Sequence, residues 1–254
     1  MNSLLTEKIT AAHAAGRLGL IPFLPAGYPD KERFWKEIAG LDAGGADIIE
    51  IGVPFSDPVA DGPVVEAASL KALDLGVNLS WILTELAKHR AGIRAGIVLM
   101  GYLNPVLQYG VERFAKDAAG AGVNGLILAD LPFEEAGAVR AALEAQGLDL
   151  IPLVGLNTSR ERMGLYAKNA RGFAYFVSVL GTTGERASLP PEVRQGLALA
   201  KEVFGIPLAL GFGIKSPEQL AELRGQVDAA VFGSSLIKHL DEGGDAAGFM
   251  ARWK

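Results

Sequence analysis

The chain has 254 residues, half of them hydrophobic, and a net charge of −5 at pH 7. We expect residues 1–254 to form a single domain, because this length fits one large α/β barrel and the apolar content supplies a sizeable core. The acidic balance and the lack of Lys/Arg runs argue against a nucleic-acid partner, and the absence of cysteine excludes disulfides, thiolate metal sites and a cysteine nucleophile.

The first segment, residues 1–16, has an apolar pattern that contains Glu7 and Lys8. This pattern predicts an amphipathic helix rather than a signal peptide. No apolar run in the sequence approaches the about 18 residues that a membrane span needs. We therefore expect a soluble, cytoplasmic protein.

Short apolar runs then alternate with longer stretches of helical periodicity. The runs are nearly continuous in Val, Ile, Leu and Ala, which is typical of strands covered on both faces. Asp30, Ser80 and Ser216 are helix start signals, the last with Pro217 at the first helical position. The predicted strands are Leu18–Leu24, Asp47–Gly52, Gly96–Gly101, Gly125–Ala129, Leu150–Val154, Ala174–Val179, Pro207–Leu210 and Ala229–Phe232. The predicted helices include Asp30–Ala43, Gly62–Leu75, Ser80–Arg90, Val111–Ala121, Glu134–Gln146, Pro191–Phe204 and Ser216–Leu223.

Eight such strand–helix units predict an α/β fold, a closed (β/α)8 or TIM barrel. The helix at residues 1–16 and the helix Ser80–Arg90, which follows the second strand, are additions to the eightfold pattern. The alternative is an open, doubly wound sheet.

The run from Glu50 to Pro63 begins in the second strand and continues into a loop rich in Gly and Pro. Because side chains alternate along a strand, Ile49 and Ile51 should pack outward on helices while Glu50 points into the barrel mouth. Asp61 follows in the loop. Two carboxylates in one pocket can perform separate acid and base steps. A buried ion pair plus a loop-capping Asp is the structural alternative.

Glycines gather where the last three predicted strands end. They lie in 181–184, in 211–213 and at Gly233, which precedes Ser234 and the last helix. Glycine lets backbone N–H groups approach an anion closely, and a helix amino terminus adds a favourable dipole. The pattern predicts a phosphate site, with tight barrel turns that bind nothing as the alternative.

Several other mechanisms lack the residues they require. No predicted strand interior contains the lysine of a Schiff-base aldolase. The three histidines, His13, His89 and His239, are far apart in predicted helices and are interpreted as surface residues, so we expect no metal site. What remains is phosphate anchoring beside two carboxylates, which suits cofactor-free acid–base chemistry on a small phosphorylated molecule.

The run Glu50–Gly62 closely resembles the signature of the tryptophan synthase α-subunit family, and the resemblance extends from the first helix to the last. That family is a (β/α)8 barrel that cleaves indole-3-glycerol phosphate to indole and glyceraldehyde 3-phosphate. The chain departs from the family pattern at Pro25, at Gly155-Leu156 and within 179–182. Supporting matches are Ile21-Pro22-Phe23, Ala26–Pro29, Tyr102, Asn104-Pro105, Asp130-Leu131-Pro132, Gly181, Thr183-Gly184, Gly211–Ile214 and Gly233-Ser234.

The resemblance implies a role for each matched residue. Glu50 would be the acid–base residue, and burial beside Ile and Phe should raise its pKa. Asp61 would stay ionised, accept a hydrogen bond from the indole N–H and stabilise the positively charged intermediate. Backbone amides near Gly184, Gly213, Gly233 and Ser234, with the Ser234 hydroxyl, would hold the phosphate. Phe23, Tyr102, Tyr175 and Phe212 would line the indole side, and Thr183 would close over Asp61.

The family passes indole through a tunnel to a pyridoxal-phosphate β subunit. The resemblance therefore implies an α2β2 complex in which the cofactor belongs to the partner and this chain holds none. Plain loop structure is the alternative for the matched loop residues, since Pro and Asp are common in turns. The residues at or near the implied contact are Pro54, Phe55, Asp57, Pro58, Asn104 and Asp130.

Three other functions are alternatives to this one. A free-standing indole-3-glycerol phosphate lyase is not distinguished by sequence. A noncatalytic phosphate-ligand subunit that only activates a partner is disfavoured by the intact Glu50 and Asp61. A different phosphate-binding barrel, such as a sugar-phosphate isomerase or a thiamin-phosphate enzyme, is disfavoured by the specificity of the Glu50–Gly62 run.

Overall fold

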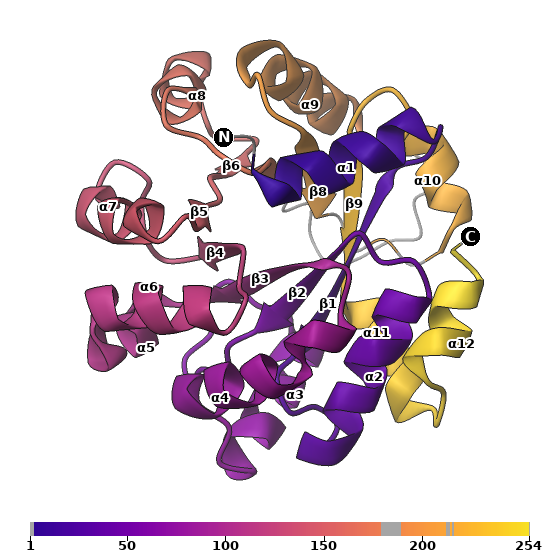
Figure 1. Ribbon diagram of the computed structural model, residues 1–254. Coiled ribbons are helices and arrows are strands. Elements are labelled where there is room, and N and C mark those ends of the chain that lie inside the picture. The colour runs from indigo at the N-terminus through magenta and orange to yellow at the C-terminus, as the bar shows by residue number, and fades with distance from the viewer. Residues whose placement is uncertain (1–2, 179–188, 212–213, 215, 254) are drawn as a thin grey trace.

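A computed structural model describes residues 3–178, 189–211, 214 and 216–253. Within these ranges, nine parallel strands form one sheet in the order β5-β4-β3-β2-β1-β9-β8-β7-β6, and helices surround it (Figure 1). This arrangement confirms the predicted barrel. The strands are β1 Gly19–Pro25, β2 Ile48–Gly52, β3 Gly96–Gly101, β4 Gly125–Leu128, β5 Asp149–Leu150, β6 Leu153–Gly155, β7 Ala174–Val177, β8 Leu208–Gly211 and β9 Ala229–Phe232.

The helices include the two predicted additions: α1 at the start, and α4, which follows α3 between β2 and β3. Helices α5, α8 and α12 were not among the helices predicted from the sequence. The helices are α1 Leu4–Ala14, α2 Lys31–Ala43, α3 Pro63–Asp74, α4 Leu79–His89, the 3-10 turn η1 Arg90–Gly92, α5 Leu103–Tyr109, α6 Val111–Gly120, α7 Gly137–Ala145, α8 Arg160–Ala167, α9 Pro191–Val203, α10 Glu218–Leu223, α11 Ser234–Asp241 and α12 Ala246–Ala251.

The predicted fifth strand, Leu150–Val154, is wrong as one element, because it consists of β5 and β6 with a break at Ile151-Pro152. Proline has no N–H to donate and interrupts the ladder. The barrel still closes across the break. The Ile151 N–H donates to the Leu126 carbonyl at 3.0 Å, and the Pro152 carbonyl accepts from the Tyr175 N–H at 3.0 Å.

Two predicted helix starts are also corrected. Helix α4 is capped by the Asn78 side chain, which accepts from the Trp81 N–H at 3.0 Å, and not by Ser80. Helix α10 begins at Glu218 with Pro217 as its N-cap, and no side chain within the described ranges caps it. Asp30 does cap α2, accepting from the Glu32 and Arg33 N–H groups.

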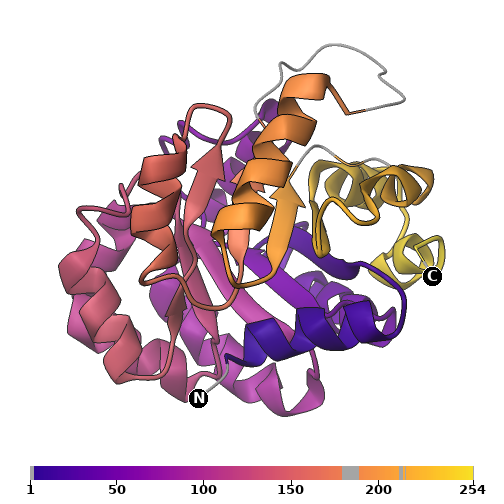
Figure 2. The same cartoon turned by 90° about the horizontal axis from the view of Figure 1, so that it is seen from above.

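The barrel interior is an apolar cluster separate from the larger core between the sheet and the helices. Ile48 belongs to the inner cluster and Ile49 and Ile51 to the outer one, as alternation along β2 predicted. Helix α1 lies across the end where the strands begin (Figure 2), and its Leu5 and Ile9 enter the inner cluster. The barrel is therefore closed by α1 at one end, which leaves the carboxyl ends of the strands as its open mouth.

None of the helices in the described ranges is long and apolar enough to cross a membrane.

Candidate active site

Glu50 lies on β2 at the mouth of the barrel. In the sheet register it is flanked by Phe23 on β1 and Val98 on β3. Glu50 is 1% exposed, and neither of its carboxyl oxygens has a hydrogen-bond partner in the described part of the chain. A buried carboxyl group without a partner is costly to ionise. The Glu50 carboxyl group is therefore left unpaired by the described residues at the edge of the cavity.

The pKa of Glu50 is raised to about 8, first by burial and then by the negative charge of Asp61. This direction agrees with the expectation from sequence. A carboxyl group with such a pKa is mainly protonated at neutral pH and can act as a general acid.

Asp61 lies in the loop between β2 and α3. Burial raises the pKa of Asp61, a hydrogen bond with the Tyr102 side chain lowers it, and the charge of Glu66 raises it. The Tyr102 hydroxyl also accepts from the Ala60 N–H at 3.1 Å. The Tyr102 hydroxyl thus binds the loop between β2 and α3 at both Ala60 and Asp61, a contact that the sequence pattern did not reveal.

A cavity of about 870 Å³ occupies the mouth, and Glu50 and Asp61 both line it. Its size suits a small organic molecule. Tyr102 lies beside this cavity and lines a smaller adjoining one. Lining residues on the strands or directly after them include Phe23, Met100, Leu128, Leu153, Tyr175, Gly211, Gly233 and Ser234.

Glycines leave room for the two aromatic rings in this wall. A Cβ at Gly52 or at Gly233 would lie 2.7 Å from the Phe23 ring, and a Cβ at Gly211 would lie 2.5 Å from the Tyr175 hydroxyl oxygen. Any side chain at these positions would displace the rings. Burial raises the pKa of Tyr175 well above its usual range, and the charges of Glu50 and Asp61 raise it further, so the phenol stays protonated.

Gly233 and Ser234 open helix α11 at the edge of the cavity. The helix amino terminus therefore meets the cavity, as an anion site requires. The other predicted contacts of this group, Thr183, Gly184, Phe212 and Gly213, lie outside the described residues.

The residues predicted at a partner contact lie on loops that follow the strands, except Asn104, which is in the first turn of α5. Phe55 stacks on Tyr102 with ring centroids 5.0 Å apart, and its N–H donates to the buried Ser69 hydroxyl at 3.2 Å. Asp130 accepts from the Leu103 N–H at 2.8 Å. Pro54 is buried, Phe55 and Pro58 are half-buried, and Asp57, Asn104 and Asp130 are exposed.

Sequence reasoning missed a polar group on the cavity wall. The Arg162 Nε lies 2.6 Å from a Glu134 oxygen and donates to the Tyr166 hydroxyl at 2.7 Å. Arg162 and Tyr166 line the cavity. Both residues lie on α8, which has no clear apolar periodicity, so the sequence pattern did not predict this helix.

Across the described ranges no three His, Asp or Glu side chains are grouped as a metal site would need. His13 and His89 are exposed, as predicted, whereas His239 is half-buried against Phe249 with ring centroids 5.5 Å apart.

Known proteins resemble this chain over nearly its whole length. The family model described as tryptophan synthase alpha chain matches residues 9–251. The chain is 66% identical over 250 residues to the tryptophan synthase alpha chain of Maridesulfovibrio salexigens, covering 98% of each chain. It is 65% identical over 252 residues to that of Solidesulfovibrio magneticus, covering 99% of this chain and 98% of the other.

Solved structures are similar over the same length. A tryptophan synthase structure from Mycobacterium tuberculosis in space group F222 superposes with a TM-score of 0.92 at 36% identity, covering 100% of this chain and 97% of the other. The tryptophan synthase alpha chain of Legionella pneumophila subsp. pneumophila gives a TM-score of 0.89 at 32% identity, covering 100% and 96%.

Proposed function

The chain belongs to the tryptophan synthase alpha chain family and is a lyase of tryptophan biosynthesis, and from this premise we propose that Glu50 and Asp61 carry out the cleavage of indole-3-glycerol phosphate. The observation that supports this most directly is the Glu50 carboxyl group, which is buried at the cavity without a hydrogen-bond partner among the described residues and has a pKa of about 8. We further propose that residues 1–254 are one catalytic domain built on the single barrel.

The cleavage needs one proton placed on carbon and another removed from oxygen. The protonated Glu50 donates to the indole carbon that bears the glycerol chain, which leaves a positively charged ring. Asp61 accepts a hydrogen bond from the ring N–H and its negative charge stabilises that cation. Removal of the glycerol hydroxyl proton, assisted by Glu50 after it has ionised, forms the aldehyde. The carbon–carbon bond breaks and its electron pair returns to the ring as indole.

Substitution of each carboxyl group tests these roles. Glu50→Gln and Asp61→Asn should each lower turnover by about 10²-fold or more, because each removes a proton-transfer or charge-stabilising group. Binding of inorganic phosphate, measured as competitive inhibition or by calorimetry, should remain. Turnover near that of the unaltered enzyme in either variant would remove that residue from the mechanism.

The phosphate of the substrate is bound at the amino terminus of α11, by the backbone of Gly233 and Ser234 and by the Ser234 hydroxyl. Gly184 and Gly213 complete this group, and Phe23, Tyr102, Tyr175 and Phe212 contact the indole ring, with Thr183 closing over Asp61. Ser234→Asp should abolish inhibition by inorganic phosphate through charge repulsion, while an acidic residue in the first turn keeps the helix stable. Ser234→Asn, which is similar in size and neutral, is the control and should retain inhibition.

The mouth of the barrel docks on a β subunit in an α2β2 complex, and indole passes to that partner, which alone carries pyridoxal phosphate. The contact includes Pro54, Phe55, Asp57, Pro58, Asn104 and Asp130. Support comes from the exposed apolar side chains Val59 and Leu107 on the same rim, which are 87% and 53% exposed. The role in amino-acid biosynthesis favours the cytoplasm as the site of the complex.

Indole release from indole-3-glycerol phosphate, with and without an added tryptophan synthase β subunit, tests the partner. Slow release that accelerates on addition supports the complex. Release that is fast and indifferent to the partner would instead indicate a free-standing lyase.

A further inference from the structure

Phe232 joins the phosphate-binding end of the cavity to the last helix of the barrel. It is the last residue of β9, and the next two residues are Gly233 and Ser234. Its side chain is 2% exposed and faces the outer core, away from the interior cluster. There its ring stacks on Trp253, with centroids 4.0 Å apart and planes at 12°. Movement of this ring would therefore move the strand end that carries Gly233 and Ser234.

Phe249 completes a cluster of three rings with Phe232 and Trp253. The Phe249 centroid lies 5.9 Å from that of Phe232 and 5.6 Å from that of Trp253. Trp253 is 5% exposed, and its backbone N–H donates to the Met250 carbonyl at 2.9 Å. The cluster is thus a compact contact between β9 and the segment 246–253, in which each ring limits the movement of the other two.

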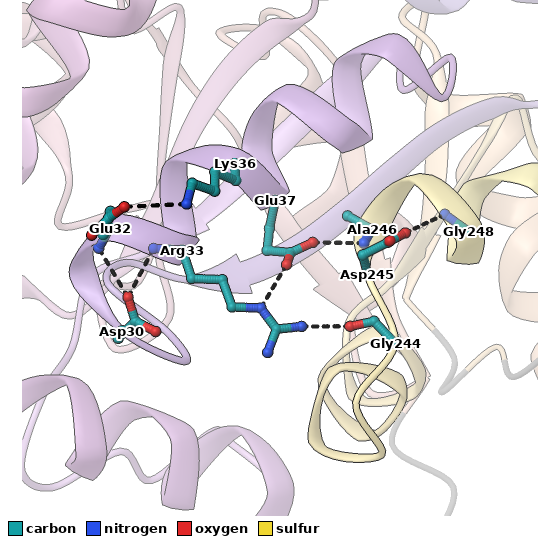
Figure 3. A network of polar contacts seen from close by, with 9 residues as sticks. All are labelled: Asp30, Glu32, Arg33, Lys36, Glu37, Gly244, Asp245, Ala246 and Gly248. Atoms are coloured by element: carbon teal, nitrogen blue, oxygen red, sulfur yellow. Dashed lines mark hydrogen bonds and ion pairs between the residues drawn. The ribbon is translucent and has the colours of Figure 1, made fainter.

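Polar contacts fix α12, which carries this segment, on α2 (Figure 3). The buried Glu37 accepts from the Ala246 N–H at 2.6 Å and from the Arg33 Nε at 2.8 Å. The Arg33 guanidinium also donates to the Gly244 carbonyl, and Asp245 caps α12 by accepting from the Gly248 N–H at 2.7 Å. The start of α12 is therefore anchored on α2 by Glu37 and Arg33 and is capped by its own Asp245.

The two helices also approach unusually closely. A Cβ at Gly44 would lie 2.4 Å from the Met250 Cβ, and one at Gly40 would lie 3.1 Å from the Ala247 nitrogen. Glycine at position 40 of α2 and at position 44, its C-cap, lets α12 lie directly on this backbone. Because α12 is held in this way, Trp253 presents a fixed surface to Phe232.

We propose that Trp253 is a positioning residue for phosphate binding, which acts through Phe232 on Gly233 and Ser234. The inference rests on the proposed function, in which α11 binds the substrate phosphate. Hydrogen bonds to an anion depend steeply on distance and angle. Without the indole ring of Trp253, Phe232 loses its stacked partner and keeps only the tilted contact with Phe249, and Gly233 and Ser234 shift. The phosphate lies away from the bond that breaks, so the change affects binding more than chemistry.

Kinetics of Trp253→Ala test the proposal in the complete chain. We expect KM for indole-3-glycerol phosphate and the inhibition constant of inorganic phosphate to rise about tenfold together, since sub-ångström misplacement weakens binding, while kcat stays within about twofold. Trp253→Phe keeps an aromatic ring against Phe232 and should restore most of the affinity. Trp81→Ala is the matched control, because Trp81 packs on Phe34 and Trp35 between α4 and α2 and should leave both constants unchanged.

Each outcome decides one step. Unchanged KM and phosphate inhibition in Trp253→Ala, with Ser234→Asp still abolishing inhibition, overturns the role of Trp253 and leaves the phosphate site intact. Unchanged inhibition in Ser234→Asp overturns the phosphate site itself. An equal fall in kcat for Trp253→Ala and Trp81→Ala with constant KM means general destabilisation and overturns the proposal. If Trp253→Ala does not fold, Trp253→Leu is measured in the same way, and an unchanged KM then overturns it.

Discussion

The carboxyl group of Glu50 has opposite effects on activity and on stability. Its side chain is buried without a hydrogen-bond partner in the part of the chain that the structure describes, and its pKa is raised from 4.5 to about 8. Between these two values the unfolded chain loses the Glu50 proton while the folded chain keeps it. The free energy of unfolding therefore falls as pH rises across this window and becomes flat above it.

Glu50→Gln has no titrating group at this position, so it should become progressively more stable than the unaltered protein as pH rises. The difference in unfolding free energy should grow by about 1.4 kcal/mol per pH unit between pH 5 and 8 and level off above pH 8. Urea denaturation of both proteins at pH 5, 6.5, 8 and 9 measures it. A difference that does not change with pH would show that Glu50 ionises normally in the folded chain.

Tyr102 offers a second test at this scale. Tyr102→Phe removes the hydroxyl that binds Asp61 and accepts from the Ala60 N–H, but keeps the ring that stacks on Phe55. Loss of a hydrogen bond to a charged group should lower kcat/KM about tenfold or more. Because this bond lowers the pKa of Asp61, the acidic limb of the pH profile should also move to higher pH. Tyr109→Phe, which loses a bond to Asp117 on α6, is the control and should keep both.

Sequence reasoning reached the side chains whose positions follow from alternation and motif, and missed those fixed by tertiary contact. Glu50 could be assigned to the mouth because Ile49 and Ile51 alternate with it along one strand. By contrast, the Tyr102 hydroxyl contacts the loop from the N-cap of α5, and Ser69 contacts it from α3. Nothing local in the sequence specifies that these elements meet there.

The same difference holds for whole elements. Strands with unbroken apolar runs were predicted closely, and β9 has the predicted bounds Ala229–Phe232. The run Leu150–Val154 is also apolar, but Pro152 divides its pairing between β4 and β7. Whether such a proline breaks a strand depends on which partner each residue faces, and that is decided by barrel closure.

Helix α1 gives an element-scale prediction with an adjacent control. Leu5 is fully buried in the barrel interior, whereas Leu4 is 38% exposed on the same helix. Leu5→Ala should lower the free energy of unfolding by about 3 kcal/mol, the usual cost of a cavity in a packed core. Leu4→Ala should change it by less than about 0.5 kcal/mol. Equal effects in urea denaturation would show that α1 does not seal the barrel.

At the scale of the whole molecule, the two ends of the barrel are different surfaces. At one end Leu5 and Ile9 fill the interior, and Gly96 and Gly125 leave room for Leu5, since a Cβ at either would lie within 2.9 Å of it. At the other end the strand termini, the cavity and the exposed loops share one rim. The proposed transfer of product to a partner would use this rim, because α1 lies across the opposite end.

Leu107 and Leu75 test that asymmetry as a matched pair. Leu107 lies on α5, which follows the carboxyl end of β3 at the mouth, and is 53% exposed. Leu75 is the C-cap of α3, at the end of this helix that is away from the β2–α3 loop, and is 40% exposed. Both Leu→Arg substitutions should change stability by less than about 0.5 kcal/mol, because the sites are exposed. Only Leu107→Arg should weaken binding of a tryptophan synthase β subunit, by about tenfold or more, since it introduces a charge into an apolar contact.

Calorimetric titration of each variant with the β subunit measures this difference in affinity. Unaltered affinity in Leu107→Arg would move the docking surface away from α5, and equal weakening in both would point to a global effect rather than to the rim.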